Sequence, residues 1–329
     1  MSVAASPGLV KTRFFIISDT HGDDFRAQDG PIPQADVAIH CGDLTEESKL
    51  DEFRTALKSF AAVQAPLKLI IAGNHDFTLD TPAFKEKVAT AQSSLEPDLV
   101  KKIYGDYGEA RQLIEDARSA RIVFLDEGEH YFTLANGATL TVYASPFTPS
   151  LSDWGFQFHP NDGHNFSIRP GVDLVMTHGP PRGIMDYTDS KQRAGSTDLF
   201  EAVARARPRL HCFGHIHEGW GAKKVAWRKE PTEKPSHFTD IDGAGTKVVE
   251  TLKGLRAGKF DSEDVKKEKD ERDLGLRRQG CISTSHCAGD EAPLRFGEET
   301  LFVNAAIQST EECSLQLPWV VDIELPAAD

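Results

Sequence analysis

The sequence predicts an α/β fold, in which helices connect strands of a largely parallel sheet. Five short apolar runs each end in carboxylate, carboxamide or imidazole side chains, and helical patterns of apolar residues occur between some of them. Apolar runs of this length, bounded by Gly and polar residues, are typical of buried strands. The runs and their polar ends are 14–18 with Asp19 and His21, 37–39 with Asp43, 67–72 with Asn74, 172–177 with His178, and 210–213 with His215 and His217.

The run 67–72 is the centre of this pattern. It breaks at Gly73 and continues directly into Asn74, His75 and Asp76. In an open α/β sheet, ligands bind at the carboxyl ends of the strands, where neighbouring strands present their outgoing loops. We therefore expect the polar residues after all five runs to converge, although they are far apart in the sequence.

The first strands form a βαβ unit with a helix between them. A strand at 13–18 is followed by the strand that ends near Asp43, and Thr45 can cap a helix that runs to about Val63. The apolar residues of this helix recur at helical spacing and give it one buried face: Leu50, Phe53, Leu57, Phe60 and Val63. Pro66 separates the helix from the central strand.

The middle of the chain predicts a second sheet. The expected elements are a helix near 109–120 and strands at 121–125, 131–134 and 138–144. Asn136-Gly137 lies between the last two, and this pair favours a type I′ hairpin turn because both residues tolerate positive φ. The long segment 145–171 either borders an active site or is a surface connection.

The last third begins with an expected helix at 198–206 before the strand at 210–213. Residues 221–280 differ from the rest of the chain, with 15 Lys and Arg against 12 Asp and Glu and little apolar periodicity. This composition predicts a charged insertion, partly mobile, in which 261–278 is a solvated helix or is disordered. Strands at 300–307 and 320–325 should complete a sheet.

Composition excludes several classes of protein. A chain of 329 residues with 39% hydrophobic residues can bury a sizeable core, so we expect one domain over 1–329 with 221–280 as an excursion. No membrane span or secretory signal is visible, and five cysteines without a Cys-x-x-Cys pair suit reduced thiols in the cytoplasm. A net charge of −14 disfavours nucleic acid and anionic lipid as partners.

Seven of the polar residues supply oxygen or imidazole ligands for metal ions. Asp19 and His21 lie two residues apart, so on an extended segment both side chains point to one side. With Asp43, Asn74, His178, His215 and His217 they make too many donors for one tetrahedral ion, but they suit two ions that share a carboxylate. Such donors without thiolates favour Mn, Fe, Zn or Ni. Two ions roughly 3.5 to 4 Å apart can bind a bridging hydroxide and assist phosphoryl transfer.

The order and form of these blocks resemble the calcineurin-like metallophosphoesterase superfamily. The resemblance spans 14–217 and rests on Asp19-x-His21, Gly42-Asp43, Gly73-Asn74-His75-Asp76, His178 and Gly214-His215-x-His217. The segments Asp153-Trp154, 177–186 and 302–305 resemble the metallophosphoesterase-domain-containing (MPPED) branch and its class III cyclic nucleotide phosphodiesterase relatives. The fold that this implies is a sandwich of two mixed β-sheets flanked by helices, which agrees with the expected hairpin.

The resemblance also implies a role for each residue. The first metal would be held by Asp19, His21 and His217, the second by Asn74, His178 and His215, and Asp43 would bridge them. His75 would contact the scissile phosphate beside Asn74 and protonate or stabilise the leaving oxygen, and Asp76 would orient its ring. Independently of the resemblance, the planar fork of Arg182 can hold a substrate phosphate or form a surface ion pair.

We therefore expect an enzyme that hydrolyses phosphoesters by attack of a hydroxide bridging two divalent or mixed-valence transition-metal ions. The narrower resemblance favours a phosphodiesterase that acts on a small or cyclic nucleotide. A phosphomonoesterase, including a protein phosphatase, is an alternative. A non-catalytic scaffold of the same fold is another, but the presence of His75 beside every metal ligand argues against it.

Overall fold

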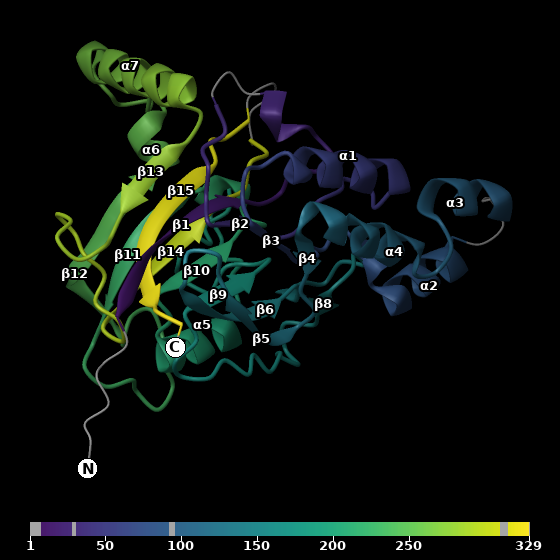
Figure 1. Ribbon diagram of the computed structural model, residues 1–329, viewed down its shortest axis with the longest axis horizontal. Helices are drawn as coiled ribbons and strands as arrows, with labels where there is room; N and C mark the ends of the chain where they lie inside the picture. The colour runs from purple at the N-terminus through teal and green to yellow at the C-terminus, as the bar shows by residue number, and fades with distance from the viewer. Residues whose placement is uncertain (1–7, 28–30, 92–95, 310–314, 329) are drawn as a thin grey trace.

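The computed structural model describes residues 8–27, 31–91, 96–309 and 315–328, which form two large mixed sheets with helices outside them (Figure 1). The first sheet contains, in spatial order, β13 (Ile282–Ser285), β15 (Trp319–Pro326), β1 (Leu9–Ile17), β2 (Val37–His40), β3 (Leu67–Ile70) and β4 (Ile122–Phe124). The second contains β12 (Ile241–Thr251), β11 (Gly221–Trp227), β14 (Glu299–Asn304), β10 (Leu210–Phe213), β9 (Leu174–Thr177), β6 (Thr139–Ser145) and β5 (Gly128–Thr133).

In each sheet, one set of neighbouring strands is parallel, so these strands all end at the same edge. Strands β1 to β4 are parallel neighbours in the first sheet, and β6, β9, β10 and β14 are parallel neighbours in the second. Antiparallel strands extend both sheets: β15 pairs with β1, β5 pairs with β6, and β11 pairs with β14. The carboxyl ends of two sets of parallel strands are therefore available for a site.

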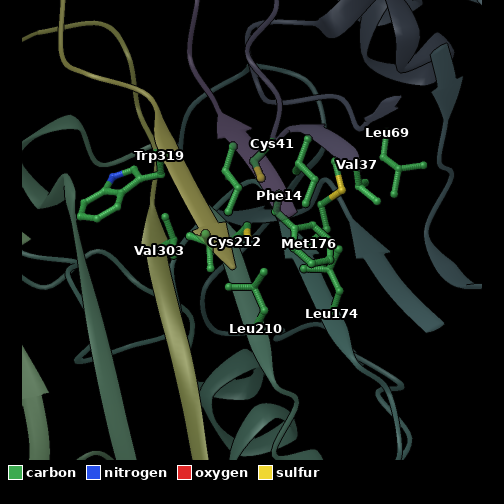
Figure 2. Packing of buried hydrophobic residues seen from close by; sticks show 14 of the residues in the cluster. Phe14, Val37, Cys41, Leu69, Leu174, Met176, Leu210, Cys212, Val303 and Trp319 are labelled. Carbon is green, nitrogen blue, oxygen red and sulfur yellow. The ribbon is translucent and has the colours of Figure 1, made fainter. Parts of the chain in front are cut away.

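Alternating side chains of β1 divide the core into layers. Phe14 and Ile16 pack between the sheets, whereas Phe15 and Ile17 point to the outer face. This two-residue period is the geometry of a strand buried on both faces. Figure 2 shows the inter-sheet layer, where Phe14 and its neighbours from the first sheet meet Leu174, Met176 and Leu210 from the second.

The α-helices of the described residues lie outside the two sheets (Figure 1). They are α1 (Leu50–Ala61), α2 (Thr81–Thr90), α3 (Pro97–Tyr104), α4 (Glu109–Asp116), α5 (Thr197–Ala206), α6 (Leu252–Leu255) and α7 (Glu263–Gln279). Apolar residues of α1 and α4 pack on the first sheet, and Leu199, Phe200 and Val203 of α5 pack on the second. The predicted α/β sandwich of two mixed sheets is confirmed. Among the described residues, none of the helices combines the length and the hydropathy that a membrane-crossing segment needs.

Most predicted elements occur, but the start of the first helix was wrong. The hairpin at Asn136-Gly137 is present and joins β5 to β6, but its turn is not the expected type I′. Gly137 has φ +85° and its N–H donates to the Leu134 carbonyl at 3.0 Å, whereas Asn136 does not have a positive φ. Helix α1 begins at Leu50, and the side chain of Glu52 accepts from the backbone N–H of Lys49 at 3.1 Å. Thr45 does not cap this helix, because its hydroxyl donates to the Asp76 carboxylate at 2.7 Å.

The segment 221–280, predicted as a charged insertion, contains two strands of the second sheet, β11 and β12. Residues 221–227 form β11, which lies inside the second sheet between β12 and β14. The charged residue Lys224 made this stretch look like an exposed segment in the sequence. In the structure Lys224 is buried, and its ammonium lies 3.1 Å from the Glu299 carboxylate. The solvated helix expected at 261–278 is present as α7, which begins after the N-cap Ser262 and ends at Gly280 with φ +79°.

Helix α7 and the segment before it should be the first part of 221–280 to be cut by trypsin. The helix buries none of its residues, and the side chains of Lys259 and Lys267 are exposed. Cleavage needs exposed chain that can open locally. We expect early cuts at Lys259 and Lys267 in a mass map, with the thermal unfolding transition of the cut protein retained. Lys224 is the internal control, and cleavage there at the same rate would contradict the assignment.

Candidate metal centre

The seven predicted ligands lie where the carboxyl ends of the two parallel halves meet. Asp19 and His21 follow β1, Asp43 follows β2 and Asn74 follows β3 in the first sheet. From the second sheet, His178 follows β9, and His215 and His217 follow β10. The sheets are joined beside this edge by two backbone hydrogen bonds, from Ser18 N–H to the Ala305 carbonyl (2.9 Å) and from Ile307 N–H to the Ser18 carbonyl (2.8 Å).

Four of the ligands have a left-handed backbone. The φ angles of Asp19, His21, Asp43 and His215 are 54°, 48°, 51° and 65°. Non-glycine residues in this region cost of order 1–3 kcal/mol each and persist only where the surroundings fix them. Here the carboxylate of Asp19 accepts the backbone N–H of His215 at 3.0 Å, which fixes one loop against another. The strained turns direct the side chains away from the ends of their strands and into a common space.

The ligand atoms fall into clusters that match the predicted division between two ions. One cluster contains Asp19, His21 and His217, and another contains Asp43, His178 and His215. Within each cluster the candidate ligand atoms lie within 4.8 Å of one another. The Asn74 amide oxygen is 2.9 Å from His178 Nε2 and so belongs beside the second cluster.

Asp43 lies between the clusters, as expected of a shared carboxylate. Its Oδ2 atom is 3.3 Å from His178 Nε2 and 3.8 Å from His21 Nε2. The same carboxylate forms a further cluster with His21 and His75. Its Oδ1 atom accepts the backbone N–H of His75 at 2.8 Å.

Two imidazoles are oriented by their outer nitrogen. His178 Nδ1 donates to the carbonyl of Cys41 at 2.9 Å, and His21 Nδ1 lies 2.9 Å from the Glu46 carboxylate. The hydrogen bond of His178 fixes its tautomer and leaves Nε2 for a metal ion, and the charge of the Glu46 carboxylate attracts the outer nitrogen of His21. In both rings the inner nitrogen is Nε2, which faces Asp43.

The carboxylates make this edge attractive to positive charge. Burial raises the pKa of Asp19, but the hydrogen bond and charge of His217 outweigh it and hold the pKa well below its ordinary value. Burial lowers the pKa of His178, but the charge of Asp43 and its hydrogen bond outweigh burial and raise the pKa to about 9. Burial and the charge of His178 instead lower the pKa of His215 to about 4.

The donor set fits two transition-metal ions. The three clusters consist of imidazole nitrogens and carboxylate oxygens, with the Asn74 amide oxygen beside them, and include no thiolate among the described residues. Imidazole and carboxylate together suit Mn, Fe, Zn and Ni. The clusters would hold one ion between Asp19, His21 and His217 and another between Asp43, Asn74, His178 and His215.

Two glycines make room for the ligands. A Cβ atom at Gly214 would collide with the Asp19 carboxylate and with Ser18, and one at Gly73 would collide with Asp43 and with the His178 ring. The motifs Gly-His-x-His and Gly-Asn-His-Asp therefore begin with glycine for a steric reason. Loops from different strands can then approach within the reach of one ion.

Asp76 has a different role from the predicted one. The Nδ1 atom of the His75 ring donates to the carbonyl of Glu46 at 2.6 Å. The Asp76 carboxylate instead accepts the backbone N–H groups of Leu44 (3.1 Å) and Gly73 (2.9 Å). It therefore fastens the Asp43 loop to the Asn74 loop rather than orienting the ring.

Besides the candidate ligands, three other residues bear on the site: Arg182, Glu46 and Trp154. Arg182 is exposed, and its Nη1 donates to the carbonyl of Arg193 at 3.3 Å, so its contact with a phosphate stays a prediction. Sequence reasoning assigned no role to Glu46, which contacts both His21 and His75, or to Trp154, which stacks on His75. These contacts join residues that are distant in the sequence, so no local sequence pattern predicts them.

Replacement of Asp43 by Asn should deplete both metal positions. One carboxylate faces ligands of both clusters, and an amide has lost the charge that holds the cations. We expect elemental analysis of the purified variant to show loss at two positions, whereas His217→Ala should affect chiefly one. Full occupancy of both ions in Asp43→Asn would rule out the shared role.

Replacement of Gly214 by Ala should weaken the cluster around Asp19. The new methyl group overlaps the carboxylate, and forced displacement in a packed site costs about 1–3 kcal/mol of stability. Metal content and the denaturant midpoint would be measured together. Gly243→Ala is the matched control because its Cβ would meet nothing within 4 Å. Equal behaviour of the two variants would contradict the steric argument.

Comparison with known proteins gives the same assignment as the site geometry. Residues 12–219 match the family model described as calcineurin-like phosphoesterase. The chain is 33% identical over 215 residues to metallophosphoesterase domain-containing protein 1 of Homo sapiens and of Mus musculus, which covers 64% of this chain and 62% of each relative. It is 30% identical over 227 residues to UPF0046 protein T07D4.2 of Caenorhabditis elegans, covering 66% of this chain and 54% of that protein.

These matches span somewhat more than half the length of the relatives. The family match contains all seven candidate ligands together with His75 and Asp76, and it ends just before β11 begins. The family match, together with the arrangement of the candidate metal ligands, shows that the chain belongs to the calcineurin-like phosphoesterase family.

Proposed function

We propose that this protein hydrolyses phosphoesters with the help of two transition-metal ions, and that its substrate is a small phosphodiester such as a cyclic nucleotide. The observation that carries the proposal is the position of His75 beside two complete ligand clusters. Its ring centroid lies 4.7 Å from that of His21, and its backbone N–H donates to the shared carboxylate of Asp43. A proton donor is thus held next to the place where the ions would bind.

The chemistry of the ions and of the chain is complementary. Two bound transition-metal ions would supply an activated water and positive charge for the phosphoryl oxygens. The chain would provide the ligands and, beside them, the amide of Asn74 as a contact for the phosphate. Manganese, iron, zinc and nickel all suit the donors, so any of them is a candidate cofactor.

His75 is proposed to give its proton to the leaving oxygen. Because Nδ1 donates to the Glu46 carbonyl, the proton given to the leaving oxygen would be the one on Nε2 of the imidazolium form, and the ring would be left neutral with its remaining proton on Nδ1. His75 is half-buried, which suits a group that must reach a bound phosphoester. A positioned acid of this kind assists departure most when the leaving oxygen is strongly basic.

The diester preference and the compartment are the finer parts of the proposal. The preference rests on the resemblance of Asp153-Trp154, 177–186 and 302–305 to the MPPED branch and its class III cyclic nucleotide phosphodiesterase relatives. The four cysteines in the described part of the chain are free thiols, which supports a cytoplasmic location. Arg182 is proposed as a weak additional contact for the substrate phosphate.

The experiment that tests this function starts from chelator-treated protein. Mn²⁺ is added back, and hydrolysis of bis- and mono-p-nitrophenyl phosphate and of a cyclic nucleotide is compared. We expect metal-dependent turnover with faster hydrolysis of the diesters. Faster monoester hydrolysis would indicate a phosphomonoesterase, and metal binding without any hydrolysis would indicate a scaffold.

His75→Ala should keep its ions and lose turnover. The general acid contributes about 10²- to 10⁴-fold, so a loss in that range is expected with an alkoxide leaving group. The loss should be smaller with p-nitrophenolate, which departs without a proton. Kinetics are compared at equal metal content.

The matched control for this variant is His159→Ala, which removes an exposed histidine. An equal loss on both leaving groups would favour a role in binding the phosphate instead. Unchanged turnover would remove any catalytic role for His75.

A further inference from the structure

The segment after β6 brings a tryptophan to the His75 ring. Trp154 lies between the short strands β7 (Thr148–Pro149) and β8 (Gln157–Phe158). Its ring is stacked on the imidazole of His75, with centroids 4.1 Å apart and an interplanar angle of 27°. This segment was ambiguous in the sequence, and the contact places it at the border of the site.

The backbone holds Trp154 firmly in this place. The N–H of Gly155 donates to the carbonyl of Asn74 at 3.0 Å, and the N–H of Phe156 donates to the Asp80 carboxylate at 2.8 Å. A Cβ atom at Gly155 would collide with the backbone of Phe77, so the two segments approach as closely as glycine permits. The tryptophan is therefore fastened to the same segment that carries His75.

The indole is half-buried and contacts further residues of its own chain. Besides His75, the Lys87 ammonium lies 5.0 Å from the centroid of the Trp154 ring, and Phe77 lies 6.0 Å from it. Lys87 also forms an ion pair with Asp153 at 3.1 Å. These contacts argue that the indole supports a neighbouring residue rather than offering a free face to a substrate.

We propose that Trp154 is a positioning residue that fixes the imidazole of His75 for proton transfer. The ring has one hydrogen bond at Nδ1, to the Glu46 carbonyl, and because a hydrogen bond tolerates a range of donor angles the ring can still turn by some degrees about its Cβ–Cγ bond. Stacking on a large planar ring removes this freedom because only one ring plane keeps the contact. The inference rests on the proposed function, in which His75 acts on the leaving oxygen.

The consequence is that Trp154 acts only through His75. A displacement of about 1 Å in a catalytic group can cost about 10²-fold in rate. Trp154→Ala should therefore reduce kcat by about 10- to 100-fold, with a smaller change in KM and with metal content unchanged. Trp154→Phe keeps an aromatic face and should recover most of the loss.

A double-mutant cycle tests this dependence. In the His75→Ala background, Trp154→Ala should produce no further loss, since the ring that it positions is already absent. Leu151→Ala is the matched control, because it truncates a large side chain of the same segment that is 79% exposed. An equal loss from Trp154→Ala in both backgrounds would overturn the proposal, and so would full activity of the single variant.

A second measurement is independent of turnover. In protein with labelled histidine, the ring carbons and protons of His75 lie in the ring-current field of Trp154, and their NMR signals are assigned by their loss in His75→Ala. We expect these signals to shift in Trp154→Ala and to stay in place in Leu151→Ala. Unshifted signals would show that the tryptophan does not hold the ring and would overturn the proposal.

The two measurements also separate this proposal from the proposed function. If the metal-loaded protein hydrolyses no phosphoester, the proposed function fails and with it the catalytic purpose of the contact. Shifted NMR signals would then still establish that the Trp154 ring lies against His75. If hydrolysis is normal in Trp154→Ala, the proposed function stands and the positioning role fails.

Discussion

The buried carboxylate of Asp43 is the interaction on which this site depends. Its side chain is 2% exposed, and its oxygens meet His75 N–H from the first sheet and the His178 imidazole from the second. A carboxylate costs several kcal/mol to bury unless it is paired and hydrogen-bonded. The loops of both sheets must therefore close around it, and their closure brings the other ligands within reach of two ions.

The surrounding loops are shaped to allow that closure. Asp76 joins the Asp43 loop to the Asn74 loop through backbone N–H groups, while Gly73 and Gly214 leave space where a side chain would collide with a ligand. The left-handed turns at Asp19 and His21 are held to the Asp43 loop by backbone hydrogen bonds, from Asp19 N–H to the Gly42 carbonyl and from His21 N–H to the Asp43 carbonyl. Strain in the backbone and hydrogen bonds between loops thus balance each other at the site.

The part of the chain beyond the family match also supports the centre. The carbonyl of Ala305, just after β14, accepts the N–H of Ser18 next to Asp19. The side chain of Gln316 donates to the carbonyl of His217 at 3.1 Å, and β15 pairs with β1 along its length. The candidate metal ligands are all in the matched region. The sheets that position these ligands also need the C-terminal strands β14 and β15.

The sequence by itself determined the fold class, the hairpin at Asn136-Gly137 and the seven candidate ligands. Each of them depends on a local pattern, either the spacing of apolar residues or the position of polar residues directly after an apolar run. Only the tertiary structure decided the bond from Thr45 to Asp76, the burial of Lys224 inside β11, and the stacking of Trp154 on His75. Each of these contacts joins two residues that are distant in the sequence, so no short stretch of the chain contains both of them. The residue types were visible, but the neighbours that give them a role came from the packing of the two sheets.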